Sequence, residues 1–297
     1  MKTMLLIVNP CSGQKKAKKH LCDLVDVFNR AGFQVITHIT ACSGDGEQAA
    51  MAYASQVDRI VCCGGDGTFN ETVSGVLKSG VRVPIGYVPC GSTNDFAASL
   101  QLSGDLLQAA RDAAGNTTLS LDVGSFGSRY FTYVASFGAF TRASFTTPQS
   151  MKNILGHAAY VLSGIQELSQ LRSQHLRFVL ENGQVLEDDY IFGAISNSTS
   201  VGGVLTLDAR QVDMTDGLFE LLLIRNPKDL FELGECVRCL QQKDYSGPML
   251  TFQKAAGLTV FPPEDMSWTL DGEQETGHPQ VQVRCLHRAI DFIIPNP

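Results

Sequence analysis

The strongest chemical signal in the sequence lies at residues 64–71, which read Gly-Gly-Asp-Gly-Thr-Phe-Asn-Glu. The segment follows the apolar run 60–63 and opens a predicted helix. Glycine lets the backbone turn tightly and come close to a ligand, and a helix N-terminus presents N–H groups and a positive dipole end to phosphate oxygens. Asp66 stands where it would face a metal-bound nucleotide. The alternative is a tight strand-to-helix turn capped by Asp66, but the flanking elements and the Thr-x-Asn-Glu sequence favour nucleotide binding.

Two further polar segments follow predicted strands. Residues 9–13 read Asn-Pro-Cys-Ser-Gly, whose small side chains would fit adenine and phosphate groups; in isolation they predict a turn. Residues 89–97 read Pro-Cys-Gly-Ser-Thr-Asn-Asp-Phe-Ala, with hydroxyl donors for phosphate, and Asp95 there would place substrate or metal. The alternative is an N-cap followed by an Asn-Asp turn. Because ligands of parallel sheets bind beyond the carboxyl ends of the strands, we expect these segments to lie together.

Carboxylates of the second half supply the groups for acid–base and metal chemistry. Asp271 and Glu273 lie in Leu-Asp-Gly-Glu at 270–273, which by composition alone is a hairpin turn. A carboxylate can also serve as a general base. Asp213 and Asp216, with the carbonyl of Leu218, are hard oxygen ligands suited to Mg²⁺. The alternative for residues 213–218 is an acidic loop that enters a strand.

The pattern of the predicted helices and strands that position these residues changes near residue 117. Before it, strand and helix patterns alternate, which predicts βαβ units and a parallel sheet. After it, strand patterns dominate. The expected strands are 4–9, 33–40, 59–63, 83–88, 118–126, 129–136, 176–180, 190–196, 218–224, 250–261, 281–286 and 289–294. The expected helices are 15–31, 47–56, 68–78, 151–171 and 231–241.

The sequence therefore predicts an α/β protein with two domains. Residues 1–120 form a parallel βαβ nucleotide-binding domain, and residues 121–297 form an antiparallel, β-rich and β-sandwich-like domain that binds substrate and metal. The active site is expected in the cleft between the domains. The pattern leaves open whether the last strand returns to the first domain.

Composition and charge narrow the function classes. A hydrophobic content of 44% and a charged content of 18% are typical of a globular protein, and the net charge of -7 argues against a general nucleic-acid binder. Nine cysteines without framework spacing predict reduced thiols in a cytoplasmic protein. The N-terminal apolar run is too short for a signal peptide. No window approaches the ~18 apolar residues of a membrane span, so any membrane contact is expected to be peripheral, at the inner face.

Taken together, these motifs resemble the signature of the diacylglycerol kinase catalytic-domain family, which includes sphingosine and ceramide kinases; NAD kinases carry a related motif. The likeness rests on residues 64–71, 9–13, 89–97 and 270–273, and it spans nearly the whole chain. This sequence departs from the usual pattern of the family at Ser92, where threonine is usual, and at Asp208, where proline is common. It also implies that Asp122 joins a network of aspartates and water to the metal.

The resemblance implies an ATP-dependent lipid kinase with Mg²⁺. The implied base is Asp271 or Glu273, with Asp66 a third candidate, and the implied metal ligands are Asp213, Asp216 and Leu218. The implied nucleotide contacts are Asn9, Pro10, Cys11, Ser12, Gly13, Thr40, Gly64, Gly65, Asp66, Gly67, Thr68, Phe69, Asn70 and Ser92. Acyl chains would lie against residues 137–145 and 151–165.

Several alternatives stay open. An NAD kinase shares the glycine-rich turn and the two-domain plan, and a non-catalytic nucleotide- or lipid-binding regulator would share the fold. The substrate lipid stays open among diacylglycerol, phosphatidylglycerol, undecaprenol and sphingoid lipids, with diacylglycerol and a phosphatidic acid product expected first. The oligomeric state is also open, a homodimer included. The lysines at 15, 16, 18 and 19 would attract ATP or anionic headgroups, or form a solvated helix face.

Overall fold

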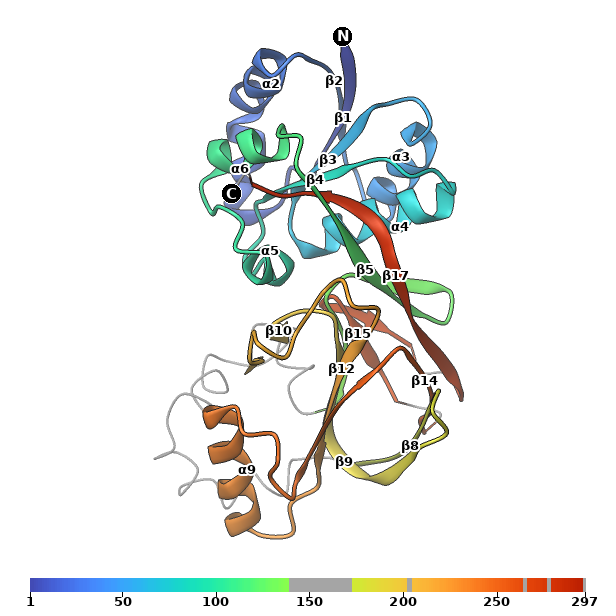
Figure 1. Cartoon of the computed structure of the whole chain (residues 1–297). Helices are drawn as coiled ribbons and strands as arrows, with labels where there is room; N and C mark the ends of the chain where they lie inside the picture. Colours follow the sequence, from blue (N-terminus) through green and yellow to red (C-terminus); the bar gives the residue numbers. More distant parts are fainter. Residues whose placement is uncertain (139–172, 202–204, 264–265, 277–278, 296–297) are drawn as a thin grey trace. The chain divides into compact units, whose positions relative to one another are not determined.

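The computed structural model describes residues 1–138, 173–201, 205–263, 266–276 and 279–295 (Figure 1). The chain divides into two compact units. The first unit comprises Met1–Val123 and Leu286–Pro297, and the second comprises Gly124–Cys285. The chain passes between the units within β5 (Thr118–Phe126) and again within β17 (Val281–Ile293). The expected helix at 151–171, and most of the segments expected to receive acyl chains, lie outside the described residues.

A five-stranded parallel sheet forms the centre of the first unit. The strands run in the order β17-β4-β3-β1-β2. The remaining elements of this unit, in chain order, are β1 (Lys2–Val8), η1 (Gly13–Lys15), α1 (Lys16–Lys19), α2 (Leu21–Arg30), β2 (Phe33–Ile39), α3 (Asp45–Tyr53), β3 (Arg59–Gly64), α4 (Asp66–Ser79), β4 (Ile85–Pro89), α5 (Asp95–Ser99) and α6 (Leu106–Ala113). Because helices cover both faces, the whole of β3 is buried.

Alternate residues of these strands face two different helix pairs. Helices α2 and α6 pack on one face and α3 and α4 on the other (Figure 1). Leu6, Val61 and Val88 point into the core under α2 and α6. On the opposite side, the ring of Phe69 in α4 packs 4.6 Å from Tyr87 and 4.3 Å from Phe96, measured between ring centroids. The parallel α/β architecture of this half was predicted correctly.

The described part of the second unit is built almost entirely from antiparallel strands. Its elements are β6 (Arg129–Phe131), β7 (Val134–Gly138), β8 (Gln174–Leu180), β9 (Val185–Ser196), β10 (Ser200–Val201), β11 (Leu205–Thr206), β12 (Phe219–Arg225), α9 (Leu230–Gln242), β13 (Leu250–Ala255), β14 (Gly257–Phe261), β15 (Trp268–Leu270) and β16 (Glu273–Glu275). In the middle of this sheet β9 pairs with β7, β8 and β12, and β12 pairs in turn with β13. Aromatic and aliphatic side chains of these strands, with Trp268 among them, form one core.

Some element boundaries differ from the expected ones for identifiable reasons. The helix expected at 15–31 is divided at His20, whose φ of -111° is not helical, into α1 and α2. Helix α6 was missed, although Asp105 caps it by accepting a hydrogen bond from the backbone N–H of Gln108. The strand expected at 250–261 is divided between β13 and β14. The two strands expected at the C-terminus form one, interrupted at Arg288, where φ is +49°.

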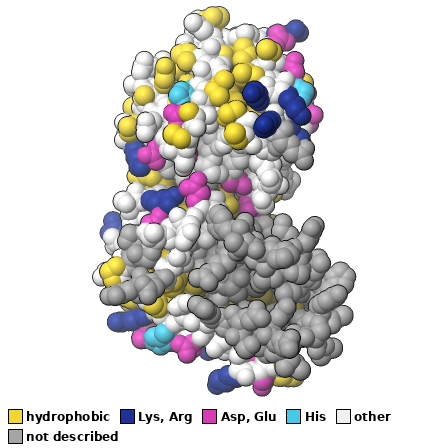
Figure 2. Space-filling model, turned by 180° about the vertical axis from the view of Figure 1, so that it is seen from behind, with side chains coloured by type: hydrophobic (Ala, Val, Ile, Leu, Met, Phe, Trp, Pro, Cys, Tyr) yellow, Lys and Arg dark blue, Asp and Glu magenta, His cyan; other side chains and the backbone are white. Residues whose placement is uncertain are grey.

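Charged side chains of both signs lie among hydrophobic ones on the face shown in Figure 2.

Within the described ranges, no helix is long and apolar enough to cross a membrane. All nine cysteines are free thiols.

Candidate active site

Three loops meet at the carboxyl end of the parallel sheet in the first unit. They follow β1, β3 and β4. The side-chain amide of Asn9 donates to Thr68 Oγ1 over 3.0 Å, which joins the first loop to the first turn of α4. The backbone N–H of Asn9 donates to the carbonyl of Cys63, and that of Cys90 to the carbonyl of Gly64. These bonds hold the loops together around the start of α4.

Glycines allow the close approach of these loops. Gly13 has φ +47°, and a Cβ placed there would lie 1.7 Å from the carbonyl oxygen of Cys90. A Cβ on Gly91 would lie 2.7 Å from the Cα of Gly65. Asn94 Oδ1 accepts the N–H of Gly91 over 2.8 Å and so holds the third loop in this shape. A side chain at Gly13 or Gly91 would therefore clash with the backbone of a neighbouring loop.

Asp66 connects two loops in the structure. Its carboxylate accepts the backbone N–H groups of Asp95 at 3.1 Å and Phe96 at 3.4 Å, at the start of α5. The ring of Phe69 is fully buried in the aromatic core, so any contact of Phe69 with a nucleotide would use its backbone. Asn70 is buried on α4, where its Oδ1 accepts the hydroxyl of Ser74 at 3.4 Å.

The other predicted nucleotide contacts lie in or next to these loops. Thr40 directly follows β2, and its N–H donates to the carbonyl of Val8 over 2.9 Å. Ser92 is exposed in the loop after β4. Cys11 donates its N–H to Asn9 Oδ1, which forms a turn within the first loop.

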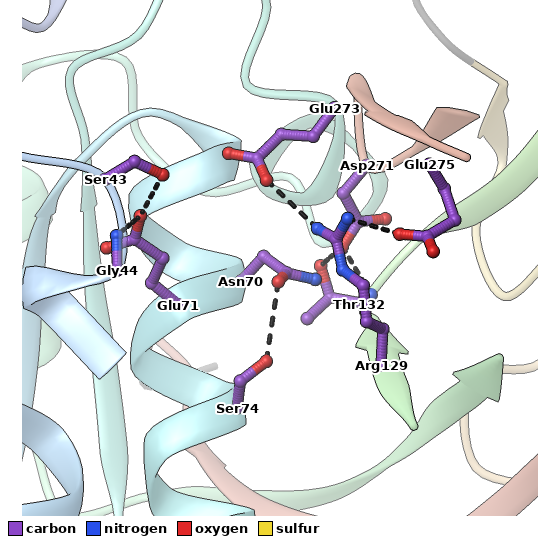
Figure 3. A network of polar contacts seen from close by, with 10 residues as sticks. All are labelled: Ser43, Gly44, Asn70, Glu71, Ser74, Arg129, Thr132, Asp271, Glu273 and Glu275. Carbon is purple, nitrogen blue, oxygen red and sulfur yellow. Dashed lines mark hydrogen bonds and ion pairs between the residues drawn. The ribbon is translucent and has the colours of Figure 1, made fainter. Parts of the chain in front are cut away.

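Glu71 has a structural role that its place in the motif did not reveal. Its carboxylate accepts the N–H of Gly44 at 2.7 Å and the hydroxyl of Ser43 at 3.3 Å (Figure 3). It also accepts the N–H of Gly46 at 3.0 Å. Glu71 thus caps the start of α3 from the neighbouring helix. Asp45, the first residue of α3, accepts the N–H of Ala41 over 2.8 Å and so holds the preceding loop against the helix.

In the second unit, the predicted carboxylate pair lies on the hairpin of β15 and β16. Asp271 is buried at the turn with φ +48°. Its Oδ2 accepts the N–H and the hydroxyl of Thr132 at 2.5 and 2.7 Å, and its Oδ1 accepts the N–H groups of Tyr133 and Val134, each at 3.0 Å. Burial raises the pKa of Asp271, and the four hydrogen bonds oppose that rise.

Glu273 lies in a different environment two residues later. Its side chain is 43% exposed, and Arg129 donates to it over 3.1 Å while also donating to Glu275 over 2.6 Å (Figure 3). The guanidinium therefore orients Glu273 without burying it. No pattern in the sequence had indicated Arg129, because the residue contacts Glu273 only through the pairing of distant strands.

The two predicted metal-binding carboxylates of the second unit already accept hydrogen bonds from other groups of the protein. Oδ1 of Asp213 accepts the N–H and the hydroxyl of Thr215. Oδ1 of Asp216 accepts the N–H of Leu218 over 2.9 Å, and its Oδ2 accepts the ammonium of Lys254 over 2.7 Å. Among the residues that the structure describes, no three His, Cys, Asp or Glu side chains gather as they would around a metal ion.

Asp122 is buried next to β17 in the first unit. Its Oδ1 accepts the backbone N–H of Arg288 over 2.6 Å and lies 3.2 Å from Nδ1 of His287. Arg288 has a left-handed backbone conformation, with φ +49°. Asp122 therefore anchors the irregular point of β17.

Comparison with known proteins identifies the family of the chain. Residues 3–126 match the diacylglycerol kinase catalytic domain family. The chain is 31% identical to the diacylglycerol kinase of Bacillus subtilis (strain 168) over 99% of this chain and 97% of that protein. It is 30% identical to the diacylglycerol kinase of Staphylococcus haemolyticus over 90% and 81% of the two chains.

A solved structure shares the fold along the entire chain. The crystal structure of a diacylglycerol kinase from Bacillus anthracis str. Sterne, described as putative in its own name, superposes with a TM-score of 0.81 at 23% identity, over 100% of this chain and 98% of that one. On the similarity to the Bacillus subtilis relative, the chain belongs to the diacylglycerol kinase family and is a lipid kinase.

Proposed function

We propose that the protein transfers the γ-phosphate of ATP to the hydroxyl of a membrane lipid, with diacylglycerol as the first candidate and phosphatidic acid as its product. The observation that carries the proposal is the meeting of three glycine-containing loops at the carboxyl end of the parallel sheet. Such an edge is where α/β proteins bind ligands. The names of the relatives, diacylglycerol kinases, supply the substrate.

In this proposal the triphosphate lies against the first turn of α4. A helix of 14 residues directs the N–H groups of that turn and the positive end of its dipole toward anions. Gly65 and Gly67 keep side chains away from the backbone there, and the loops carrying Gly13 and Ser92 border it, with Thr40 assisting. ATP enters as its magnesium complex, so the Mg²⁺ of the reaction arrives with the substrate and offsets the charge of the phosphates.

We propose Glu273 as the base. The hydroxyl oxygen of the lipid attacks the γ-phosphorus, the bond from that phosphorus to the bridging oxygen breaks, ADP leaves, and the hydroxyl proton passes to the carboxylate. Glu273 is half exposed and oriented by Arg129, whereas both oxygens of Asp271 and of Asp66 already accept backbone N–H groups. Positioning and charge stabilisation would supply most of the rate enhancement.

The substrate proposal places the enzyme in the cytoplasm, in peripheral contact with the inner face of the membrane, since its lipid substrate lies there. Acyl chains would be received by apolar residues of the second unit. A homodimer and a monomer are both compatible with the proposed chemistry, which needs residues from one chain.

Labelled phosphate measures the proposed reaction directly. The protein is incubated with γ-labelled ATP and mixed micelles that contain diacylglycerol, phosphatidylglycerol, undecaprenol or sphingosine, and with NAD in parallel. We expect label in phosphatidic acid, and a loss of about 100-fold or more in kcat for Glu273→Gln. Label on NAD would identify an NAD kinase. ATP binding without transfer to any acceptor would identify a regulator.

A further inference from the structure

A buried carboxylate lies in the sheet of the second unit without a hydrogen-bond partner. Glu220 is on β12 and is fully buried. Within the described part of this unit, neither of its carboxylate oxygens has a hydrogen-bond partner. The strand register places Glu220 between Ser196 on β9 and Lys254 on β13. A carboxylate in such a position destabilises the fold unless a positive charge accompanies it or a proton neutralises it.

Lys254 supplies a positive charge from the neighbouring strand. Its Nζ lies 3.4 Å from Oε1 of Glu220. The same ammonium lies 2.7 Å from Oδ2 of Asp216, in the turn just before β12. One cation therefore joins a buried carboxylate within the sheet to a carboxylate of the adjoining turn. Opposite charges on directly paired residues of neighbouring strands stabilise the pairing.

The turn that receives this ammonium is the one predicted to bind Mg²⁺. A magnesium ion needs near-octahedral oxygen ligands at about 2.0–2.1 Å, and it gives up its water reluctantly. Here Oδ2 of Asp216 accepts from Lys254 and Oδ1 accepts the N–H of Leu218. A divalent ion at Asp216 would have to displace the ammonium or lie beside it against charge repulsion.

We infer that Lys254 takes the place of a divalent metal ion at the turn of residues 213–218, where its ammonium bridges Asp216 to Glu220. We call these three residues the ion triad. Lys254 is thus a positioning residue, which ties the turn to β13. If the proposed kinase function is correct, the triad also implies that the magnesium requirement of the enzyme comes from ATP alone.

Nucleotide-free protein without lipid provides a test that does not depend on kinase activity. Thermal unfolding is measured with MgCl2 and with EDTA, and binding of Mn²⁺ is measured by electron paramagnetic resonance. We expect melting temperatures within about 1 °C of each other and no Mn²⁺ binding that depends on Asp216. A rise of about 5–10 °C with MgCl2, as expected for an ion at about 100 times its Kd, would overturn the inference if Asp216→Asn abolishes it. So would one bound Mn²⁺ per chain that Asp216→Asn removes.

Substitutions at Lys254 test the triad itself. We expect Lys254→Met to lower the melting temperature, the matched Lys254→Arg to lower it less, and Lys254→Met with Glu220→Gln to recover part of the loss, because the buried carboxylate then no longer needs a counter-ion. If Lys254→Met does not fold but the double variant does, that result would support the triad equally. A Lys254→Met protein as stable as the wild type would refute it. If neither variant folds, the Mn²⁺ measurement on the wild type and Asp216→Asn decides.

Discussion

Replacing Asp271 by asparagine is expected to destabilise the second unit far more than replacing Glu273 by glutamine. The carboxylate of Asp271 accepts four hydrogen bonds, two at each oxygen, and three of the donors are backbone N–H groups. Asparagine offers one acceptor oxygen in place of two. Asparagine also tolerates the left-handed backbone at this position, where φ is +48°. The change in stability therefore reports the lost hydrogen bonds and not a strained turn.

The expected magnitude follows from the donors. The amide oxygen can serve Tyr133 and Val134, and its NH₂ group then faces Thr132. The hydroxyl of Thr132 can rotate to accept, but its backbone N–H loses its partner. A buried donor without a partner costs about 1–3 kcal/mol, and the other bonds weaken because their acceptor is no longer charged. Removing the buried charge offsets part of this. We expect a net loss of about 2–4 kcal/mol, or roughly 5–15 °C in melting temperature.

Intrinsic fluorescence reports this loss directly, because the single tryptophan of the chain, Trp268, is buried in the core of the second unit. Urea unfolding of Asp271→Asn is followed by this signal. The control Glu273→Gln alters a half-exposed ion pair, worth at most about 1 kcal/mol, and should unfold like the wild type while losing phosphoryl transfer. The reasoning is refuted if Asp271→Asn keeps wild-type stability, or if Glu273→Gln keeps full activity.

Three further substitutions test the first unit. Gly13→Ala should weaken ATP binding, measured by calorimetry, about tenfold or more. The control Gly80→Ala should leave the affinity for ATP unchanged, because Gly80 is also left-handed, at φ +70°, but has open space around it. Equal affinities of the two variants would contradict the loop contact of Gly13. Glu71→Gln should lower the melting temperature because it weakens the cap of α3; an unchanged value would contradict that role. Arg82 holds the pKa of Asp291 below its ordinary value. Because folding therefore favours the ionised carboxylate of Asp291, the stability of the protein should fall as the pH drops below about 4. Asp291→Asn should flatten that fall in urea titrations, and a profile like that of the wild type would contradict it.

Most elements of the first unit, and the position of its loops, could be predicted from the amino-acid sequence. Alternation of apolar strands with helices gave a parallel sheet, and the segments at 9–13, 64–70 and 89–94 were placed at one edge because each follows a strand. Such inferences succeed because they depend on residues close together in the chain, whose periodicity and glycine content restrict the local backbone. The hairpin turn at Asp271 and Gly272 was predictable for the same reason.

The contacts of several side chains could not be predicted from the sequence, because they depend on the tertiary structure. Asp271 and Glu273 are two residues apart, yet one is buried among the backbone donors of residues 132–134 and the other is half exposed beside Arg129. Phe69 belongs to a functional motif, but its ring packs in the core. Asp216 is paired with Lys254, 38 residues away. These outcomes depend on partners brought together by strand pairing and core packing, which local sequence does not encode.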